Sequence, residues 1–160
     1  KNHASAIGTI VERKSRLTLI VPLPNDKTSE SVVKGFSNEF NQISEELKKS
    51  LTYDNGTEMT QHKKITELTG MPVYFADPGC PGQRGTNENT NGLIREFFPK
   101  GTDFKNISRS ELKRVEKLLN QRPRKILGFR TPEEVFKEME RGKKPPDRGR
   151  TQKNPGEVAP

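Results

Sequence analysis

The sequence predicts an α/β domain with a mixed sheet, and two observations support this fold class. Short segments rich in β-branched residues alternate along the chain with longer segments whose apolar residues recur every three or four positions, as in strands and helices respectively. The length of 160 residues suits one domain with a tail, and a hydrophobic content of 28% predicts a modest core.

The chain is expected to begin with a β-hairpin. Residues 6–11 and 17–21 are rich in Ile, Val, Leu and Thr, and the polar stretch 12–16 between them is typical of a turn. Pro22 and Pro24 are expected to end the second strand, because proline cannot donate to a ladder.

A helix, a strand, a second helix and a second strand are predicted next. Residues 28–49 carry one apolar stripe at helical spacing, which predicts a long helix. Residues 51–54 are a strand candidate that the turn signal at 55–56 closes, and residues 72–75 are another. Between them, residues 59–70 predict a helix ending at a glycine, with one apolar face formed by Met59, His62, Ile65 and Leu68.

The C-terminal half predicts an irregular loop, three helices and a tail. Residues 77–85 are rich in proline and glycine, and helices are expected over 86–98, over 108–120 and from residue 131 onward. The last two helices open with capping-box spacing, at Ser108 with Glu111 and at Thr131 with Glu134. We expect the folded domain to span residues 1–140 and residues 141–160 to form a basic, disordered tail.

Positive charge is concentrated in the last third of the chain. Of the net charge of +8, residues 1–108 hold 14 Lys and Arg against 13 Asp and Glu, whereas residues 109–160 hold 15 against 8. This asymmetry favours a polyanionic partner such as nucleic acid, and a solubilising tail is the alternative.

Cysteine content and hydropathy exclude several classes of protein. Cys80 is the only cysteine, which excludes disulfides within the chain and cysteine-rich zinc sites and fits a reducing cytoplasm. No apolar run has the length of a membrane span, and no signal-peptide pattern is present. Because the sequence starts at Lys1 rather than Met, we expect it to be a piece of a longer protein.

Two carboxylates form the candidate site. Asp54 lies where a predicted strand ends, and Glu88 lies at the predicted start of a helix, with one helix and one strand between them. Functional groups gather at the carboxyl ends of strands in α/β sheets, and carboxylates are suitable ligands for Mg²⁺. Two such ions would activate the attacking oxygen and stabilise the leaving oxygen in phosphoryl transfer. The alternatives are a turn role for Asp54 and a helix-dipole role for Glu88.

Several long motifs resemble bacterial insertion-sequence transposases of the acidic-triad class, in the subgroup whose core is similar to retroviral integrase. They are LTYDNGTE at 51–58, QRGTNENTNGL at 83–93, FFPKGTDF at 97–104, and LNQRPRKILG at 119–128 followed by Thr131-Pro132-Glu133. The resemblance runs from about residue 6 to residue 136. It departs from the subgroup at Gly82, where a Trp is usual.

The resemblance implies a ribonuclease-H-like mixed sheet flanked by helices, with three metal-binding carboxylates and two Mg²⁺ or Mn²⁺ ions. Asp54 matches the second carboxylate and Glu88 the third. The first is expected on a strand preceding the hairpin, where this sequence has only Lys1-Asn2-His3, and Asp26 lies in a turn beyond the second strand. We therefore expect an integrase-type core lacking its first strand, with a divided sheet, marginal stability and incomplete catalysis.

Further positions are candidates for contact with DNA. Asn55, Asn87 and Asn89 flank the carboxylates, where they are suited to orienting ligands or touching phosphates, or to capping and turning the chain. Arg84 precedes a helix start, where it is placed to meet a phosphate or to remain solvated. The extended segment Arg122-Pro123-Arg124-Lys125 is expected to project three cations toward a DNA backbone, or to stabilise the turn between two helices. His62 is expected to pack on its helix rather than catalyse.

The resemblance implies DNA transposition: hydrolysis at the element end, followed by attack of the freed 3′ hydroxyl on target DNA. The implied partners are the element ends and target DNA, with a homo-oligomer assembled on them, no membrane, and a place in the bacterial cytoplasm at the nucleoid. The alternatives are a non-catalytic DNA-binding or regulatory protein derived from a transposase, and a related nuclease that only cuts.

Overall fold

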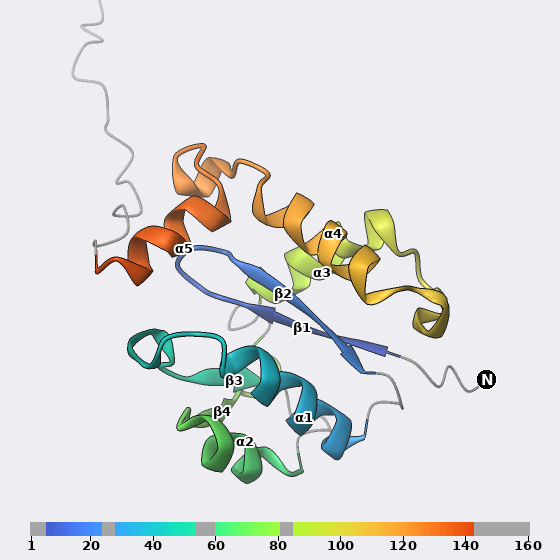
Figure 1. Cartoon of the computed structure of the whole chain (residues 1–160), viewed down its shortest axis with the longest axis vertical. Coiled ribbons are helices and arrows are strands. Elements are labelled where there is room, and N and C mark those ends of the chain that lie inside the picture. The colour runs from blue at the N-terminus through green and yellow to red at the C-terminus, as the bar shows by residue number, and fades with distance from the viewer. Residues whose placement is uncertain (1–5, 24–27, 54–59, 81–84, 143–160) are drawn as a thin grey trace, which may run out of the picture.

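The computed structural model describes residues 6–23, 28–53, 60–80 and 85–142 of the chain. A β-hairpin of β1 (Ala6–Val11) and β2 (Thr18–Leu23) lies between two groups of elements (Figure 1). One group contains α3 (Gly85–Phe97) and α4 (Arg109–Asn120), and the other contains α1 (Ser29–Phe40), α2 (His62–Thr69), β3 (Leu51–Tyr53) and β4 (Val73–Phe75). Helix α5 (Pro132–Glu140) follows α4, and short 3₁₀ turns are η1 (Glu45–Leu47), η4 (Phe104–Asn106) and η5 (Lys125–Leu127).

The hairpin is antiparallel and its turn is held by one carboxylate. Ala6 pairs with Leu23 and Val11 with Thr18. The Glu12 carboxylate accepts hydrogen bonds from the backbone N–H and the hydroxyl of Ser15, both at 2.6 Å. The predicted hairpin is therefore confirmed, and its turn closes because a buried serine satisfies the glutamate that precedes it.

Pro22 does not end the second strand as expected, since β2 continues to Leu23. The backbone N–H groups of Thr18 and Ile20 point away from β1 and donate to side chains of α4. Strand alternation gives Pro22 the same outward direction, so its missing N–H removes no bond between β1 and β2.

Two apolar clusters lie on opposite faces of the hairpin. Val21 and Leu23 pack with α1 and α2, whereas Ile20 packs with α3 and α4, as alternation along β2 requires. Helix α1 approaches closely because it presents Gly35 to the hairpin: a Cβ there would lie 2.7 Å from Val21 Cγ1. On the hairpin side, Gly8 leaves the matching space for the Phe36 ring.

Helix α1 is shorter than the predicted helix over residues 28–49. Thr28 caps its N-terminus, but the helix ends at Phe40 with Asn41 as its C-cap, and a separate 3₁₀ turn follows. The apolar spacing persists beyond the helix because Ile43 still packs on the apolar cluster between α1 and the hairpin. Helix α2 also differs from expectation, since Leu68 is 57% exposed and Thr69 is the buried residue in the last turn.

The four described strands form two separate pairs rather than one continuous sheet. β1 pairs with β2, and β3 pairs in parallel with β4, with Leu51 opposite Val73 and Tyr53 opposite Phe75. The antiparallel and parallel pairs give the mixed character that the sequence predicts, and their separation agrees with the expected division of the sheet.

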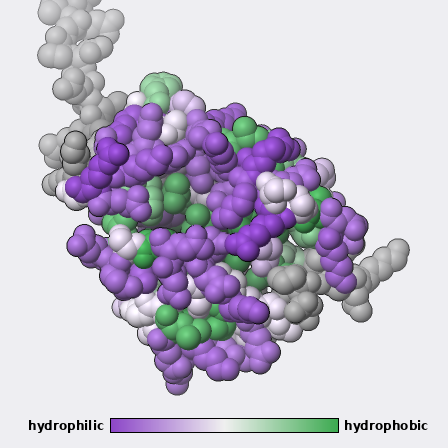
Figure 2. Space-filling view, in the orientation of Figure 1, coloured by the Kyte–Doolittle hydropathy of each residue, from purple (hydrophilic) through white to green (hydrophobic). Residues whose placement is uncertain are grey.

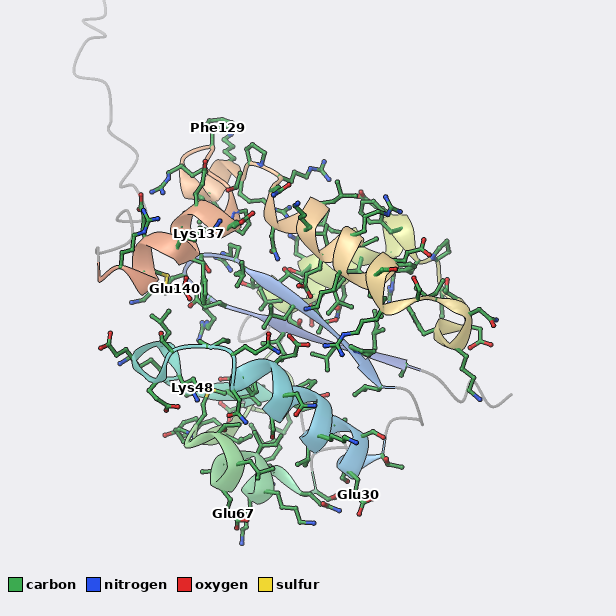
Figure 3. All side chains as sticks on the ribbon, in the orientation of Figure 1. Glu30, Lys48, Glu67, Phe129, Lys137 and Glu140 are labelled. Atoms are coloured by element: carbon green, nitrogen blue, oxygen red, sulfur yellow. The ribbon has the colours of Figure 1, made fainter. Side chains whose placement is uncertain are left out.

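One face of the molecule is mostly polar. Figure 2 shows a face dominated by hydrophilic residues, with apolar residues in small separate areas. Figure 3 places Phe129 at the outer end of the connection between α4 and α5, where it is 72% exposed. In the described part of the chain, no helix has both the length and the apolar character to span a membrane.

Candidate active site

Helix α3 carries Glu88 in its first turn. The helix is oriented by Ile94 and by Phe98 just beyond its end, which pack with Ile20 and the apolar face of α4. The Glu88 side chain is exposed, and no cation of the described residues lies within ion-pair distance of it. A carboxylate at this end of a helix is favoured by the helix dipole. The fold therefore presents one exposed carboxylate on a fixed backbone.

Strand β3 leads to the position of Asp54. The strand is held by β4, and the Ala76 N–H donates to the Tyr53 carbonyl at 2.8 Å. The Tyr53 ring packs edge-on against Phe36, with ring centroids 6.0 Å apart. β3 thus ends one residue before Asp54. Asp54 and Asn55 lie outside the described residues, so their role stays a prediction.

The polar neighbours of Glu88 differ in their surroundings. Asn87 lies in the same turn, and its Oδ1 is buried with no hydrogen-bond donor among the described residues in reach. Asn89 is exposed and lines a cavity on another side of α3. Arg84 lies outside the described residues. A buried amide oxygen without a partner is costly, so the Asn87 environment differs from that of the exposed Asn89.

His62 packs against an aromatic ring, as expected. It begins α2, and its ring meets Phe75 edge-to-face with centroids 5.0 Å apart. The contact joins α2 to the end of β4, beside the end of β3. His62 therefore supports the elements that lead toward Asp54.

The basic segment after α4 differs from the expected row of three projecting cations. Arg122 and Lys125 are exposed, and Arg122 Nη1 lies 3.7 Å from Glu96 Oε2 on α3. Arg124 is instead half-buried, because its guanidinium turns back and donates to the Leu119 carbonyl at 3.1 Å. The segment thus supplies two surface cations and one that is held inside.

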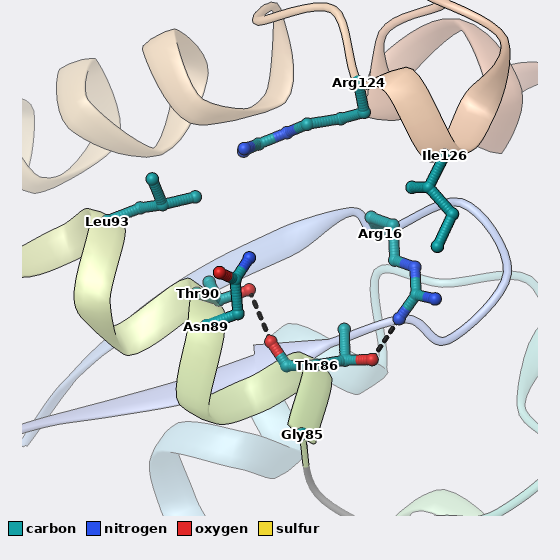
Figure 4. Close-up of a pocket in the computed structure, with 8 residues that line it drawn as sticks. All are labelled: Arg16, Gly85, Thr86, Asn89, Thr90, Leu93, Arg124 and Ile126. Carbon is teal, nitrogen blue, oxygen red and sulfur yellow. Dashed lines mark hydrogen bonds between the residues drawn. The ribbon is translucent and has the colours of Figure 1, made fainter.

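Arg16 is a further polar contact of α3 that the sequence did not indicate. It lies in the hairpin turn with φ 65°, and its Nη1 donates to the Thr86 hydroxyl in the first turn of α3 (Figure 4). The two residues are 70 positions apart in sequence. No local pattern distinguishes Arg16 from its neighbours Arg13 and Lys14, so only the fold identifies it.

Metal ligands are limited in the described part of the chain. Among residues 6–23, 28–53, 60–80 and 85–142, no group of three His, Cys, Asp or Glu side chains lies close enough together to hold an ion. Glu88 fits a hard cation by its chemistry, since it is an exposed carboxylate with no competing basic partner among those residues.

Comparisons with known proteins find that the chain is similar to proteins of mobile elements over part of their length. No family model matches the sequence. It is 51% identical over 138 residues to the transposase InsI for insertion sequence element IS30A of Escherichia coli, covering 86% of this chain. It is 45% identical over 137 residues to the transposase for element IS1086 of Cupriavidus metallidurans. A putative integrase of Spiroplasma virus SpV1-R8A2 B is 31% identical over 138 residues.

The matching segment is a fraction of each relative. The chain spans 35% of the length of the Escherichia coli protein, 40% of the Cupriavidus protein and 42% of the viral one. Among solved structures, the catalytic core domain of BIV integrase superposes with a TM-score of 0.63 at 20% identity, covering 86% of this chain and 89% of that one. The α/β fold is therefore that of an integrase catalytic core, which is ribonuclease-H-like.

Proposed function

We propose that this chain, which is homologous to insertion-sequence transposases over the segment it spans and has an integrase-core fold, supplies two carboxylates of a DNA strand-transfer site. The observation that carries the proposal is the 51% identity to a transposase across a segment that includes both acidic motifs. The position of Glu88 in the first turn of α3 and the end of β3 one residue before Asp54 support the proposal, because functional groups gather at the carboxyl ends of strands.

The reaction is transfer of a phosphoryl group between DNA hydroxyls. A phosphodiester at the element end is hydrolysed, which frees a 3′ hydroxyl. That hydroxyl attacks a phosphodiester of the target, forming a new P–O bond as the target's own 3′ oxygen leaves. Alignment of the reacting groups and stabilisation of charge supply most of the rate in such reactions.

Glu88 and Asp54 are the proposed ligands of two Mg²⁺ or Mn²⁺ ions. When bound, such ions supply Lewis-acid stabilisation of charge on phosphate oxygens. Glu88 is suited to this role because its carboxylate is exposed and has no cation partner among the described residues. We propose Asp54 as the second carboxylate of the acidic triad and Glu88 as the third.

DNA is the proposed partner, as element ends and as target, with a homo-oligomer assembled on it in the bacterial cytoplasm at the nucleoid. The basic C-terminal third supports this proposal, with 15 Lys and Arg against 8 Asp and Glu over residues 109–160. The proposed DNA contacts are Arg84, Asn55, Asn87, Asn89, Arg122, Arg124 and Lys125.

The test uses the InsI transposase with this chain in place of its own matching segment, so that the rest of the protein comes from the relative. Glu88→Gln is expected to lower strand transfer about 100-fold or more while DNA binding is retained, because a neutral amide replaces a charged ligand. Glu67→Gln, an exposed change on α2, is the matched control and should leave strand transfer unchanged.

Strand transfer that survives Glu88→Gln would contradict the assignment of Glu88. A segment swap that binds element ends but never transfers strands would instead favour the alternative of a non-catalytic protein derived from a transposase. A swap that cuts the ends without joining them would favour a nuclease.

A further inference from the structure

A cavity of about 260 Å³ lies between the hairpin turn, α3 and the η5 turn (Figure 4). Arg16 lines it from the hairpin turn and Arg124 from the start of the η5 turn, and Thr86, Asn89 and Leu93 line it from α3. Among the described residues, the lining contains two guanidinium groups, an amide and two hydroxyls, and no carboxylate. A cavity with this composition is suited to an anion.

Arg124 is held in place by hydrogen bonds and forms no ion pair with a carboxylate of the described residues. Its backbone N–H donates to the Arg130 carbonyl at 2.9 Å, and its side chain donates to the Leu119 carbonyl at 3.1 Å. No carboxylate of the described residues lies within 4.0 Å of its guanidinium, because Glu96 pairs with Arg122 instead. Its Nε is buried without a hydrogen-bond acceptor among the same residues.

Burial and the neighbouring Arg122 both lower the pKa of Arg124, and Glu96 opposes them only in part. A cation that is partly withdrawn from water without an ion-pair partner is costly. An anion bound beside the guanidinium would compensate that cost, which is the first indication that the cavity takes a ligand.

Arg16 approaches the same cavity from a constrained backbone. Its φ of 65° is a conformation that non-glycine residues rarely adopt, and the turn is fixed by hydrogen bonds from Arg16 N to Glu12 O at 2.9 Å and from Glu12 N to Leu17 O at 2.8 Å. The Arg16 guanidinium reaches Thr86 at the start of α3. The turn thus directs a second cation to the helix terminus.

The first turn of α3 adds backbone donors to the cavity. The first N–H groups of a helix have no intrahelical acceptor, and the helix dipole places partial positive charge there. Thr86 and Glu88 lie roughly 160° apart around the helix axis at 100° per residue. The cavity is therefore on a different side of α3 from the proposed catalytic carboxylate.

We propose that this cavity binds one phosphate of a DNA backbone, outside the site of phosphoryl transfer. The proposal rests on the proposed function for the choice of DNA over free phosphate. Leu93 and Ile126 give the cavity apolar walls suited to a deoxyribose, and the exposed Arg122 and Lys125 continue the positive charge from Arg124 along the surface. The contact anchors the duplex to the helix that carries Glu88.

The test measures how the affinity of the full chain for a DNA duplex depends on salt. Each phosphate contact contributes about 0.9 to the slope of log K against log salt, so Arg124→Gln should reduce the slope by about one. Arg124→Lys, which keeps the charge, should retain most of it. Arg114→Gln is the matched control, because Arg114 is 63% exposed on α4 away from the cavity lining, and it should leave the slope unchanged.

A second variant separates the phosphate contact from a purely structural role of Arg124. Asn89 is exposed and lines the cavity, so Asn89→Asp adds a negative charge there without breaking a side-chain hydrogen bond between described residues. It should weaken DNA binding at least as much as Arg124→Gln, with an unchanged circular dichroism spectrum. Wild-type affinity and slope in both variants would overturn the proposal.

Inorganic phosphate serves as a second probe, which distinguishes a site for free phosphate from a site for a DNA phosphate. Phosphate should shift the amide resonances of Thr86 and Asn89 in the wild-type chain and not in Arg124→Gln. Phosphate binding together with an unchanged DNA slope would identify a free-phosphate site and overturn the DNA assignment. If the chain binds DNA and neither variant changes the affinity, only the proposal that the cavity binds a DNA phosphate is contradicted. If the wild-type chain binds no DNA, the proposed function is contradicted as well.

Discussion

Asn120 satisfies both backbone groups of a buried residue on the edge of the hairpin. Its Oδ1 accepts from the Thr18 N–H and its Nδ2 donates to the Thr18 carbonyl, both at 2.8 Å. One turn earlier on α4, Glu116 accepts from the Ile20 N–H at 2.7 Å. These two side chains occupy the edge of β2 as a further strand would, which keeps that edge from pairing with another molecule.

Replacing Asn120 should therefore cost more than its size suggests. Asn120→Ala leaves the N–H and C=O of Thr18, which is 1% exposed, without partners. At about 1–3 kcal/mol for each of these two groups, the free energy of unfolding should fall by about 2–6 kcal/mol. Urea denaturation measures this, with Gln121→Ala, an exposed neighbouring amide, expected to cost under about 0.5 kcal/mol. Equal effects of the two substitutions would show that the Thr18 bonds contribute nothing.

Glu134 should confer a pH dependence on stability through the cap of α5. Its carboxylate accepts the Thr131 N–H at 2.8 Å, which lowers the pKa of Glu134 from its ordinary value of 4.5. Because the unfolded state then binds the proton more readily, the stabilisation is complete above the ordinary pKa and disappears as pH falls through the folded-state pKa. Glu134→Gln should flatten the acid limb of a plot of Tm against pH, while an unchanged limb would assign it to other carboxylates.

At the scale of elements, the contact between α1 and the hairpin depends on a glycine in each. A Cβ at Gly8 would lie 2.5 Å from Phe36 Cε1 and 3.1 Å from its Cζ. Phe36 is 1% exposed and packs edge-on against Phe40, so its ring has no space into which to move. The contact determines how α1 lies on β1.

Gly8→Ala should accordingly destabilise the chain by about 1–3 kcal/mol, as overpacking of a buried contact does. Gly92→Ala is a control of opposite sign: nothing lies within 4 Å of a Cβ at Gly92, and removing a helical glycine should stabilise α3 by about 0.5–1 kcal/mol. Thermal denaturation of the two variants measures the difference. Combining Gly8→Ala with Phe36→Leu should recover part of the loss if the ring is the obstacle.

Local patterns predicted which elements form better than where they end. The β-branched segment 6–11 corresponds to β1, and the capping box at Thr131 is present in full at α5. The end of α1 was predicted wrongly because Ile43 keeps its apolar contact after the helix has ended at Phe40. The prediction that Pro22 ends the second strand was wrong because a proline disrupts a strand only where its nitrogen faces the partner strand, and the sequence does not show that direction.

The local structure of the candidate site could be predicted from the sequence, but its contacts with distant segments could not. A helix opening just before Glu88 follows from local sequence, and the structure confirms it. The burial of Arg124 and the approach of Arg16 to Thr86 depend on contacts between segments distant in sequence, which no periodicity encodes. Sequence motifs therefore indicated the chemistry of the acidic residues, whereas the polar surroundings of α3 required the fold.

At the scale of the whole molecule, the two strand pairs are joined by side-chain packing. One cluster contains Val21 of the hairpin, Phe36 of α1, Ile65 of α2 and Met71 between α2 and β4. No ladder hydrogen bond between described residues connects β1–β2 with β3–β4. The larger pair has six residues in each strand, and the smaller pair has three.

This arrangement predicts that the 160-residue chain unfolds in parts. The β3–β4 pair has few ladder bonds, so its amides should exchange with solvent well before those of the hairpin, which α3 and α4 also cover. Hydrogen exchange followed by mass spectrometry should show early labelling at residues 51–53 and 73–75 and late labelling at 18–23, and thermal melting should be broad. A strand hydrogen-bonded to both β1 and β3 would join the two pairs. An added peptide that forms such a strand should therefore sharpen the thermal transition and slow amide exchange in both pairs at the same peptide concentration. One sharp transition of the chain alone, with equal protection of both pairs, would show that the shared apolar cluster is sufficient for cooperative folding.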